Sequence, residues 1–138
     1  ILCCVGNVSE THKDNPSIVQ LGYVKDSNKM RDIYNAADIF VLPTMADNFP
    51  NTIVEALLSG TPVASFYVGG VPEQINESNG ILIEKRDPQS VATSLDQFFD
   101  NQGAYQSELI SEQASEIYAN AGTVAKHMDL YDSLCAAR

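Results

Sequence analysis

The chain has 138 residues and a formal net charge of −10, with eight Lys and Arg against 18 Asp and Glu. This length can bury a hydrophobic core, and one domain is the default expectation. Because binding to a phosphate backbone needs clustered basic side chains, we expect no nucleic-acid partner. We also expect no membrane contact from this segment, which has neither a basic face nor an apolar run near the ~18 residues of a spanning helix.

The sequence begins without Met, in a strand-like run, and we therefore interpret it as part of a longer protein. Its cysteines, Cys3, Cys4 and Cys135, form no known motif. We expect them to be small buried hydrophobic residues in a reducing compartment. Neither histidine has a Cys or His at ligand spacing, so we predict no metal site.

The first part of the chain alternates strand and helix patterns. Ile1–Val5 predicts a buried strand, and Ser17–Val24 predicts a second one. A helix should follow, with Asp26 or Ser27 as its N-cap. The continuous apolar run Asp38–Pro43 is typical of a strand that is covered on both faces.

The alternation continues with a helix that should end at about Ser59, where Gly and Pro act as stop signals. Pro62–Phe66 and Gly80–Ile83 predict strands, and Gly69–Asn76 should turn into a short helix. Three amphipathic helices complete the expected elements, at Pro88–Asp100, Gly103–Tyr118 and Thr123–Ala137. The last helix has an apolar stripe of Val124, His127, Met128, Tyr131, Leu134 and Cys135.

Strands that alternate with helices predict an α/β fold with a doubly wound, mostly parallel sheet and helices on both faces. Ligands of such sheets bind outside the carboxyl ends of the strands. Asp47 follows the strand that should end near Pro43, and Gly69 and Gly70 follow the strand that should end near Phe66. Both loops should therefore open on the functional edge of the sheet.

Two acids, Asp47 and Glu55, are separated by seven residues. The first should lie in a loop and the second in the first turn of the following helix. A helix N-terminus collects unpaired N–H groups and partial positive charge, which suits a phosphate. Carboxylates accept hydrogen bonds from sugar hydroxyls. Together these groups indicate a sugar nucleotide as the ligand.

Each of these features also has a purely structural interpretation. Thr52 and Glu55 fit a capping box, in which Thr52 caps the helix and Glu55 reaches back to the N–H of Thr52. Asp47–Asn48 fits a simple turn, and Gly69–Gly70 fits a strand-to-helix turn. Glu73 fits an acid that is favoured by a helix dipole. Their order along one sheet edge favours the ligand site.

Five segments of the chain resemble the group 1 glycosyltransferases, which are retaining enzymes with two Rossmann-like domains, the GT-B fold. The segments are Gly22-Tyr-Val, Tyr34-Asn-Ala-Ala-Asp-Ile-Phe-Val-Leu-Pro43, Asp47…Glu55-Ala-Leu, Gly60-Thr-Pro-Val and Gly69-Gly-Val-Pro-Glu73. The resemblance covers nearly the whole chain, so residues 1–138 are expected to be the C-terminal, nucleotide-sugar-binding domain. The sequence around Asp47 is similar to that of members that act in bacterial capsule, exopolysaccharide and lipopolysaccharide assembly.

The resemblance implies a role for each site residue. Glu55 would hold the ribose hydroxyls of the donor, and Asp47 would face the donor hexose, although the family usually has Glu at that position. The loop and helix start would approach the sugar and diphosphate, and the corner at Gly22 would lie against the base. The donor-binding residues are therefore expected to be Gly22, Tyr23, Val24, Phe49, Pro50, Asn51, Thr52, Glu55, Gly69 and Gly70.

The same resemblance implies an acceptor-binding N-terminal domain that precedes Ile1, together with the Arg and Lys that neutralise the diphosphate. The last helix would cross back to that domain. We expect hexose transfer from a nucleotide-sugar to a saccharide or lipid-linked acceptor, with no cofactor and no metal. We expect a cytoplasmic enzyme, with a peripheral position at the inner face of the membrane as a variant of that location.

Two alternatives stay open, a sugar-nucleotide epimerase of the same fold and a non-catalytic nucleotide-binding scaffold. A phosphoacceptor receiver domain needs acids just after an early strand, where this chain has Gly6 and Asn7. A dinucleotide-binding domain needs Gly-x-Gly-x-x-Gly after the first strand, and the chain lacks this motif.

Overall fold

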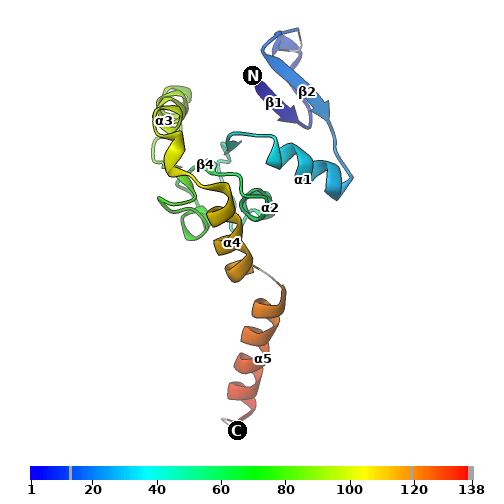
Figure 1. Cartoon of the computed structure of the whole chain (residues 1–138), viewed down its shortest axis with the longest axis vertical. Coiled ribbons are helices and arrows are strands. Elements are labelled where there is room, and N and C mark those ends of the chain that lie inside the picture. The colour runs from blue at the N-terminus through cyan, green and yellow to red at the C-terminus, as the bar shows by residue number, and fades with distance from the viewer. Residues whose placement is uncertain (13, 119, 137–138) are drawn as a thin grey trace. The chain divides into compact units, whose positions relative to one another are not determined.

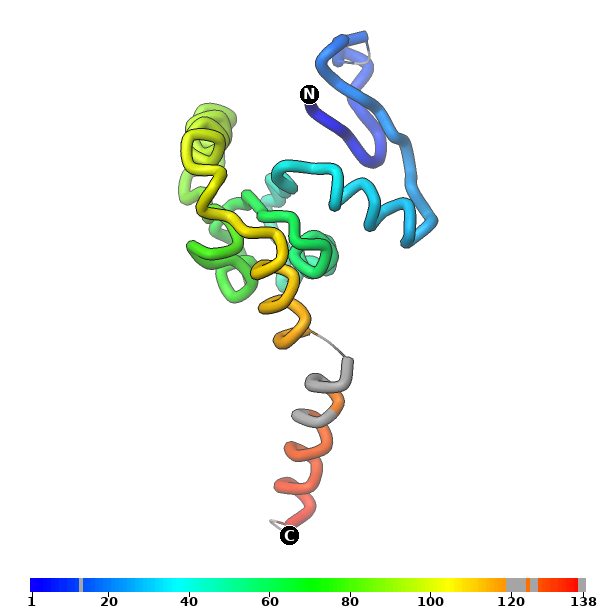
Figure 2. The backbone as a smooth tube through the Cα atoms, in the orientation of Figure 1, coloured from blue at the N-terminus to red at the C-terminus, as the bar shows by residue number. Residues whose placement is uncertain are grey.

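The computed structural model describes residues 1–12, 14–118 and 120–136, without the side chains at positions 120–123, 125 and 126. The chain divides into two compact units, Ile1–Ile33 and Tyr34–Arg138, and each unit is described by itself. Figure 1 labels most of the helices and strands, and Figure 2 traces the backbone from the N-terminus to the C-terminus.

The first unit contains two parallel strands, β1 (Leu2–Val5) and β2 (Ile18–Gly22). A short 3-10 turn, Glu10–His12, lies in the segment that joins them. Both predicted strands are confirmed, but the predicted burial is wrong. None of the described residues in this unit is buried, and Cys3 is exposed. The reason is that a two-stranded sheet gives its side chains too few neighbours to exclude water.

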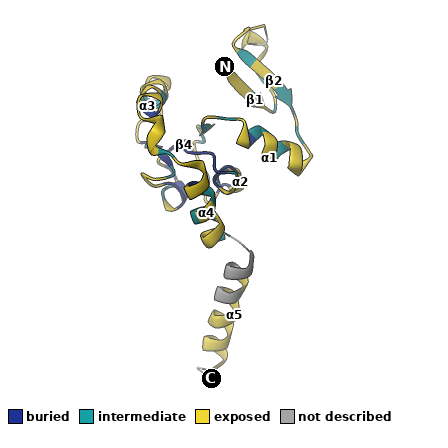
Figure 3. Cartoon of the chain, in the orientation of Figure 1, coloured by how far each residue is buried: buried dark blue, intermediate teal, exposed yellow. Residues whose placement is uncertain are grey.

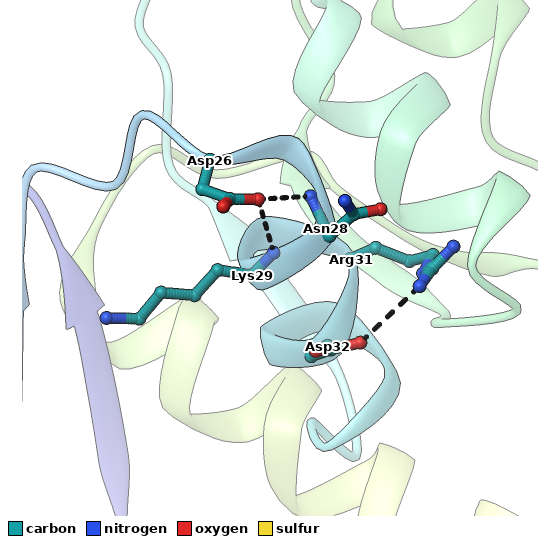
Figure 4. Close-up of polar contacts among 5 residues, drawn as sticks. All are labelled: Asp26, Asn28, Lys29, Arg31 and Asp32. Carbon is teal, nitrogen blue, oxygen red and sulfur yellow. Dashed lines mark hydrogen bonds and ion pairs between the residues drawn. The ribbon is translucent and has the colours of Figure 1, made fainter.

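Helix α1 (Ser27–Asn35) begins after Asp26, whose Oδ1 accepts hydrogen bonds from the N–H groups of Asn28 (2.8 Å) and Lys29 (3.2 Å). Figure 4 shows these bonds, together with an exposed ion pair between Arg31 and Asp32. Asp26 is therefore the N-cap, as one of the two sequence alternatives predicts. The last two residues of α1 belong to the second unit.

The second unit is built on three parallel strands in the order β3-β4-β5. They are β3 (Phe40–Leu42), β4 (Val63–Phe66) and β5 (Gly80–Ile83). The central strand β4 is buried along its whole length (Figure 3). Strand β3 is only partly buried, which corrects the prediction of a strand covered on both faces. The reason is that β3 lies at an edge of this sheet.

The helices of the second unit follow the predicted order. They are α2 (Asn51–Leu58), the 3-10 turn Val71–Glu73, α3 (Pro88–Asp100), the 3-10 turn Gln102–Ala104, α4 (Ser107–Tyr118) and α5 (Asn120–Ala136). Helix α4 begins later than predicted because the Gln102–Ala104 turn is separate from it. Helix α5 begins three residues before Thr123, and the predicted last residue of this helix, Ala137, lies outside the described residues.

Helix α3 matches its predicted bounds and has an N-cap of its own. Asp87 Oδ1 accepts from the N–H of Ser90 at 2.8 Å. This hydrogen bond is the main cause that lowers the pKa of Asp87. Pro88 occupies the first helical position, where a missing N–H is harmless. Sequence and structure agree here because the cap, the proline and the helix are all local features.

The hydrophobic core of the second unit lies around β4 and α2, where Figure 3 shows the buried residues. Its largest fully buried apolar side chains are Phe98, Ile53, Leu57, Ile110, Val63 and Val71. In α5 the predicted stripe is exposed at each of its positions, from Val124 to Cys135. No helix among the described residues has the length and apolar character to cross a membrane. The α/β class with parallel strand pairing is confirmed.

Candidate functional site

Helix α2 starts without a side-chain cap. Its N-cap is Pro50, which accepts from the N–H of Ile53 (3.2 Å) through its carbonyl oxygen and has no side chain that could cap the helix. Thr52 is the second residue of the helix and is not its cap, so the capping-box interpretation is wrong. The N–H groups at the start of a helix have no acceptor within the helix. The start of α2 therefore offers donors to an anion.

Asp47 lies in the loop before α2, and its side chain is used locally. Its Oδ1 accepts from the N–H of Phe49 at 3.1 Å. This bond closes a turn that leads the chain into the helix. Asp47 is partly buried, and it has a second carboxylate oxygen for which no hydrogen bond is described. Asp47 thus forms the simple turn, and its second carboxylate oxygen can still accept a hydrogen bond.

The loop after β4 packs directly against the loop after β3. The N–H of Gly70 donates to the carbonyl oxygen of Asp47 at 3.2 Å. A Cβ atom at Gly69 would overlap this carbonyl oxygen, and one at Gly70 would overlap the carbonyl oxygen of Asn48. Only glycine permits so close an approach of two backbones. The two loops therefore meet at one sheet edge, as the sequence predicts.

Gln74 makes a second connection between these loops. Its side chain is buried, and its Nε2 donates to the carbonyl oxygen of Pro50 at 3.3 Å. Pro50 is itself buried. A hydrogen bond from the turn that follows β4 thus holds the N-cap of α2 in place. This bond links the start of α2 to the segment that follows Gly69 and Gly70.

Glu55 is exposed and lies in the second turn of α2, which corrects the prediction that it lies in the first turn. The hydroxyl of Tyr34 donates to its Oε2 at 3.3 Å. Tyr34 is only 3% exposed, and its ring packs edge-on against Phe40 with centroids 5.3 Å apart. Burial, and then the charge and hydrogen bond of Glu55, raise the pKa of the Tyr34 phenol. One carboxylate oxygen of Glu55 is therefore held by a buried donor.

Phe49 is the aromatic residue of the loop, and 46% of its surface is exposed. Its ring contacts Tyr118 edge-on, with centroids 6.2 Å apart. Tyr118 is the last residue of α4, and burial raises the pKa of its phenol. The end of α4 therefore supports the loop that carries Asp47.

The structure brings most of the predicted site residues together. Those in the second unit are Asp47, Phe49, Pro50, Asn51, Thr52, Glu55, Gly69 and Gly70. They occupy the loop after β3, the start of α2 and the loop after β4. Gly22, Tyr23 and Val24 belong to the first unit, so their position relative to this site stays a prediction. Among the described residues no group of three or more His, Cys, Asp or Glu is arranged to hold a metal ion.

Sequence reasoning missed three residues that support this site, Tyr34, Gln74 and Tyr118. For Tyr34 the available signal is that a buried tyrosine needs a partner for its hydroxyl. Gln74 follows the Gly69–Glu73 segment directly, and a polar residue at a buried position was the available signal. For Tyr118, no local pattern points to Phe49, which lies far away in the sequence.

The site combines a free helix start with two carboxylates and offers little positive charge. No Lys or Arg lies between Arg31 and Lys85 in the sequence. An anion at α2 would therefore meet N–H groups and the helix dipole in this part of the chain. Hydroxyl groups would meet Asp47 and Glu55. This arrangement suits a ligand that carries a phosphate and several hydroxyls.

Comparison with known proteins gives a consistent result. A family model described as glycosyl transferases group 1 matches residues 2–101. An uncharacterized glycosyltransferase of Methanocaldococcus jannaschii is 30% identical over 102 residues, which cover 73% of this chain and 26% of that protein. D-inositol 3-phosphate glycosyltransferase of Corynebacterium urealyticum is 32% identical over 105 residues, which cover 74% of this chain and 24% of that protein. The chain thus spans about a quarter of the length of these relatives.

Two solved structures show the same fold. Sucrose-phosphate synthase from Thermosynechococcus elongatus superposes with a TM-score of 0.77 at 22% identity, over 99% of this chain and 39% of the other. Anabaena Alr3699/HepE in complex with UDP superposes with a TM-score of 0.74 at 20% identity, over 97% of this chain and 40% of the other. The match extends over almost the whole chain, and it confirms the Rossmann-like, GT-B type of fold.

Proposed function

The chain belongs to the group 1 glycosyltransferases, and we propose that it is the donor-binding part of a longer enzyme that transfers a hexose from a nucleotide-sugar. The observation that carries this proposal is the uncapped start of α2 between the carboxylates of Asp47 and Glu55. A nucleotide-sugar has a diphosphate between two polyols, the ribose and the hexose. Its central anion and its hydroxyls match the order of groups in the site.

In this proposal the diphosphate lies at the start of α2, where the N–H groups of Asn51 and Thr52 face the leaving group. The hydroxyls of the ribose donate to Glu55, and those of the hexose donate to Asp47. Donors that are fixed in advance stabilise the negative charge that develops on a leaving group, without reorganisation during the reaction. The turn closed by Asp47 and Phe49 and the contacts of Gly69, Gly70 and Gln74 provide that fixed geometry.

Asp47 is proposed to position the hexose and not to act as a nucleophile. Its side chain is shorter by one methylene than the Glu that the family usually has there, and its Oδ1 already accepts from Phe49. Retention of the anomeric configuration is part of the proposal, as are the absence of a metal and a cytoplasmic location. Basic residues outside residues 1–138 would complete the charge balance of the diphosphate.

The acceptor is proposed to be a saccharide or a lipid-linked saccharide, as in bacterial polysaccharide assembly. A second candidate comes from the relatives, because several are D-inositol 3-phosphate glycosyltransferases. An inositol phosphate is a polyol with a phosphate, so it would need basic residues that the acceptor side must supply. Both acceptors leave the proposed role of the donor site unchanged.

The test is a donor panel on the full-length protein that carries this chain, with analysis of products. Sugar donors of UDP, GDP and ADP would be supplied with saccharide acceptors and with D-inositol 3-phosphate. A free nucleoside diphosphate together with a glycoside supports the proposal. An isomerised donor without glycoside would show an epimerase, and donor binding without any product would show a non-catalytic nucleotide-binding scaffold.

A further inference from the structure

We propose that Tyr34 is a positioning residue that holds the Glu55 carboxylate in the orientation that receives the ribose hydroxyls of the donor. The inference rests on the proposed ribose role of Glu55 and adds a residue from a different element to that site. Tyr34 lies near the end of α1, and Glu55 lies in α2, 21 residues further along the chain.

Tyr34 is itself firmly placed within the second unit. Its side chain is buried, and its ring meets Phe40 of the edge strand β3 at an interplanar angle of 85°. Its carbonyl oxygen accepts from Thr61 Oγ1 at 2.7 Å, and Thr61 is also buried. Both its backbone and its ring therefore have partners from the segment around the sheet. Its hydroxyl is the one polar atom of the side chain, and it reaches Glu55.

Glu55 has the opposite character, because it is exposed. A free glutamate on a helix surface samples many rotamers, and a ligand that uses it must stop this motion. The hydrogen bond from Tyr34 to Oε2 restricts the carboxylate before any ligand arrives. An ionised carboxylate accepts about four hydrogen bonds, so Oε1 and the remaining lone pair of Oε2 stay available. Two neighbouring hydroxyls of a ribose could use these acceptors.

The competing explanation is that Tyr34 only needs a partner because it is buried. In that case loss of its hydroxyl would change the stability of the fold and leave ligand preference unchanged. If Tyr34 is a positioning residue, loss of its hydroxyl lowers the affinity only for ligands that have ribose hydroxyls, because those are the groups that Glu55 binds.

The test compares ribose and dideoxyribose ligands in the full-length protein. The affinities of UDP, GDP and ADP are measured against those of their 2′,3′-dideoxy forms by calorimetry. The quantity of interest, for one base, is the dissociation constant of the dideoxy form divided by the dissociation constant of the ribose form. Tyr34→Phe is compared with Glu55→Ala and with the control Tyr105→Phe, which changes a partly buried tyrosine that packs on Phe98.

We expect Tyr34→Phe to lower this ratio about three- to tenfold, as the loss of one hydrogen bond implies. The affinity for the dideoxy forms should stay at the wild-type value. Glu55→Ala should bring the ratio close to one, and Tyr105→Phe should leave it unchanged. An unchanged ratio in Tyr34→Phe, with a collapsed ratio in Glu55→Ala, overturns the positioning role alone. An unchanged ratio in Glu55→Ala shows instead that the proposed ribose role is wrong, and the inference falls with it.

A second measurement needs no variant and covers the case in which Tyr34→Phe fails to fold. The wild-type protein is labelled with 13C at the ζ carbon of its tyrosines. Saturation with the ribose ligand should shift the Tyr34 resonance, because Glu55 Oε2 then shares its lone pairs with a ligand hydroxyl. The dideoxy ligand should leave that resonance in place. If neither ligand changes the chemical shift of the Tyr34 resonance, the proposal is overturned.

Discussion

Gly69 and Asp47 meet backbone to backbone, with no room for a Cβ atom between them. The atom that blocks a side chain is the carbonyl oxygen of Asp47, so no rotation of a flexible side chain could relieve the overlap. Gly70 has the same relationship with Asn48. The two loops that frame the start of α2 can therefore approach this closely only because Gly69 and Gly70 have no side chains. The position of Asp47 depends on both glycines.

Gly69→Ala and Gly70→Ala should each destabilise the chain by about 1–3 kcal/mol or more, because extra atoms are forced into a closed contact. Gly69 has a positive φ of 50° as well, which adds backbone strain for any other residue. Urea unfolding of the chain measures the free energy of unfolding. Gly103→Ala is the control, because a Cβ there has nothing within 4 Å. Equal stability of all three variants would contradict the close contact.

Glu55→Ala should weaken donor use by the full-length enzyme, because a charge-assisted hydrogen bond to the ribose is lost. The expected cost is ~1.5–3 kcal/mol, which is about ten- to a hundredfold in kcat/KM. Glu55→Gln keeps an acceptor for Tyr34 but loses the charge, so it should still lose much of the donor affinity. The measurement is steady-state kinetics with the best donor of the panel. Wild-type kinetics in both variants would remove Glu55 from the site.

Asp47→Ala should reduce turnover and change nucleotide affinity little, because the hexose is its proposed partner. The alanine variant also breaks the turn to Phe49, whereas Asp47→Asn retains an oxygen for that N–H. Comparing the two variants separates loop geometry from charge. The check is kcat of the full-length enzyme beside the affinity for the free nucleoside diphosphate. A parallel loss of nucleotide affinity in Asp47→Asn would place Asp47 outside the hexose pocket.

Much of this fold follows from local patterns. The order of helices and strands is predicted correctly because periodicity, glycine and proline act over a few residues. The bounds of α3 belong to this class, and the N-cap of α1, Asp26, is one of the two residues that the sequence offers for it. The sheet edge that carries Asp47 and Gly69 is also predictable, because parallel strands place their carboxyl ends together.

Most of what the sequence does not predict depends on neighbours that are distant in the sequence. The apolar run Ile1–Val5 predicts a buried strand, yet burial depends on the layers that surround a strand. The capping box at Thr52 is wrong for a local reason, because the N-cap is Pro50 and the helix begins two residues earlier than this pattern predicts. The bond from Tyr34 to Glu55 joins two helices, and single-sequence periodicity contains no information about such a contact.

Alkaline pH offers a direct test of the environment of Tyr34. Burial first, and then Glu55, raise its pKa above the ordinary value of 10.0, so the folded chain favours the neutral phenol. The stability that this preference contributes is complete below pH 10 and is lost as the pH rises toward the folded pKa. Tyr34→Phe should remove this part of the loss, and Glu55→Gln should reduce it partly, because burial remains.

Urea unfolding of wild type and variants across the alkaline range measures this difference. The slope of unfolding free energy against pH should be smaller in Tyr34→Phe than in wild type above pH 10. Tyr105→Phe is again a useful comparison, since burial raises the pKa of Tyr105 without a carboxylate as a further cause. Identical slopes in wild type and Tyr34→Phe would show that the phenol is not protected in the fold.

The isolated chain should fold, yet it should be catalytically silent and bind nucleoside diphosphates only weakly. The site that we propose for the diphosphate has N–H groups but no basic residue between Arg31 and Lys85, in a chain with a net charge of −10. A helix terminus contributes only ~0.3–1 kcal/mol at exposed sites. We therefore expect dissociation constants of about 1 mM or higher, which correspond to a binding free energy of about −4 kcal/mol or weaker. Calorimetry with UDP, GDP and ADP is the measurement, and the full-length protein is the comparison. Micromolar binding by the isolated chain would show that the start of α2 needs no basic partners, and our account of the phosphate site would then be wrong.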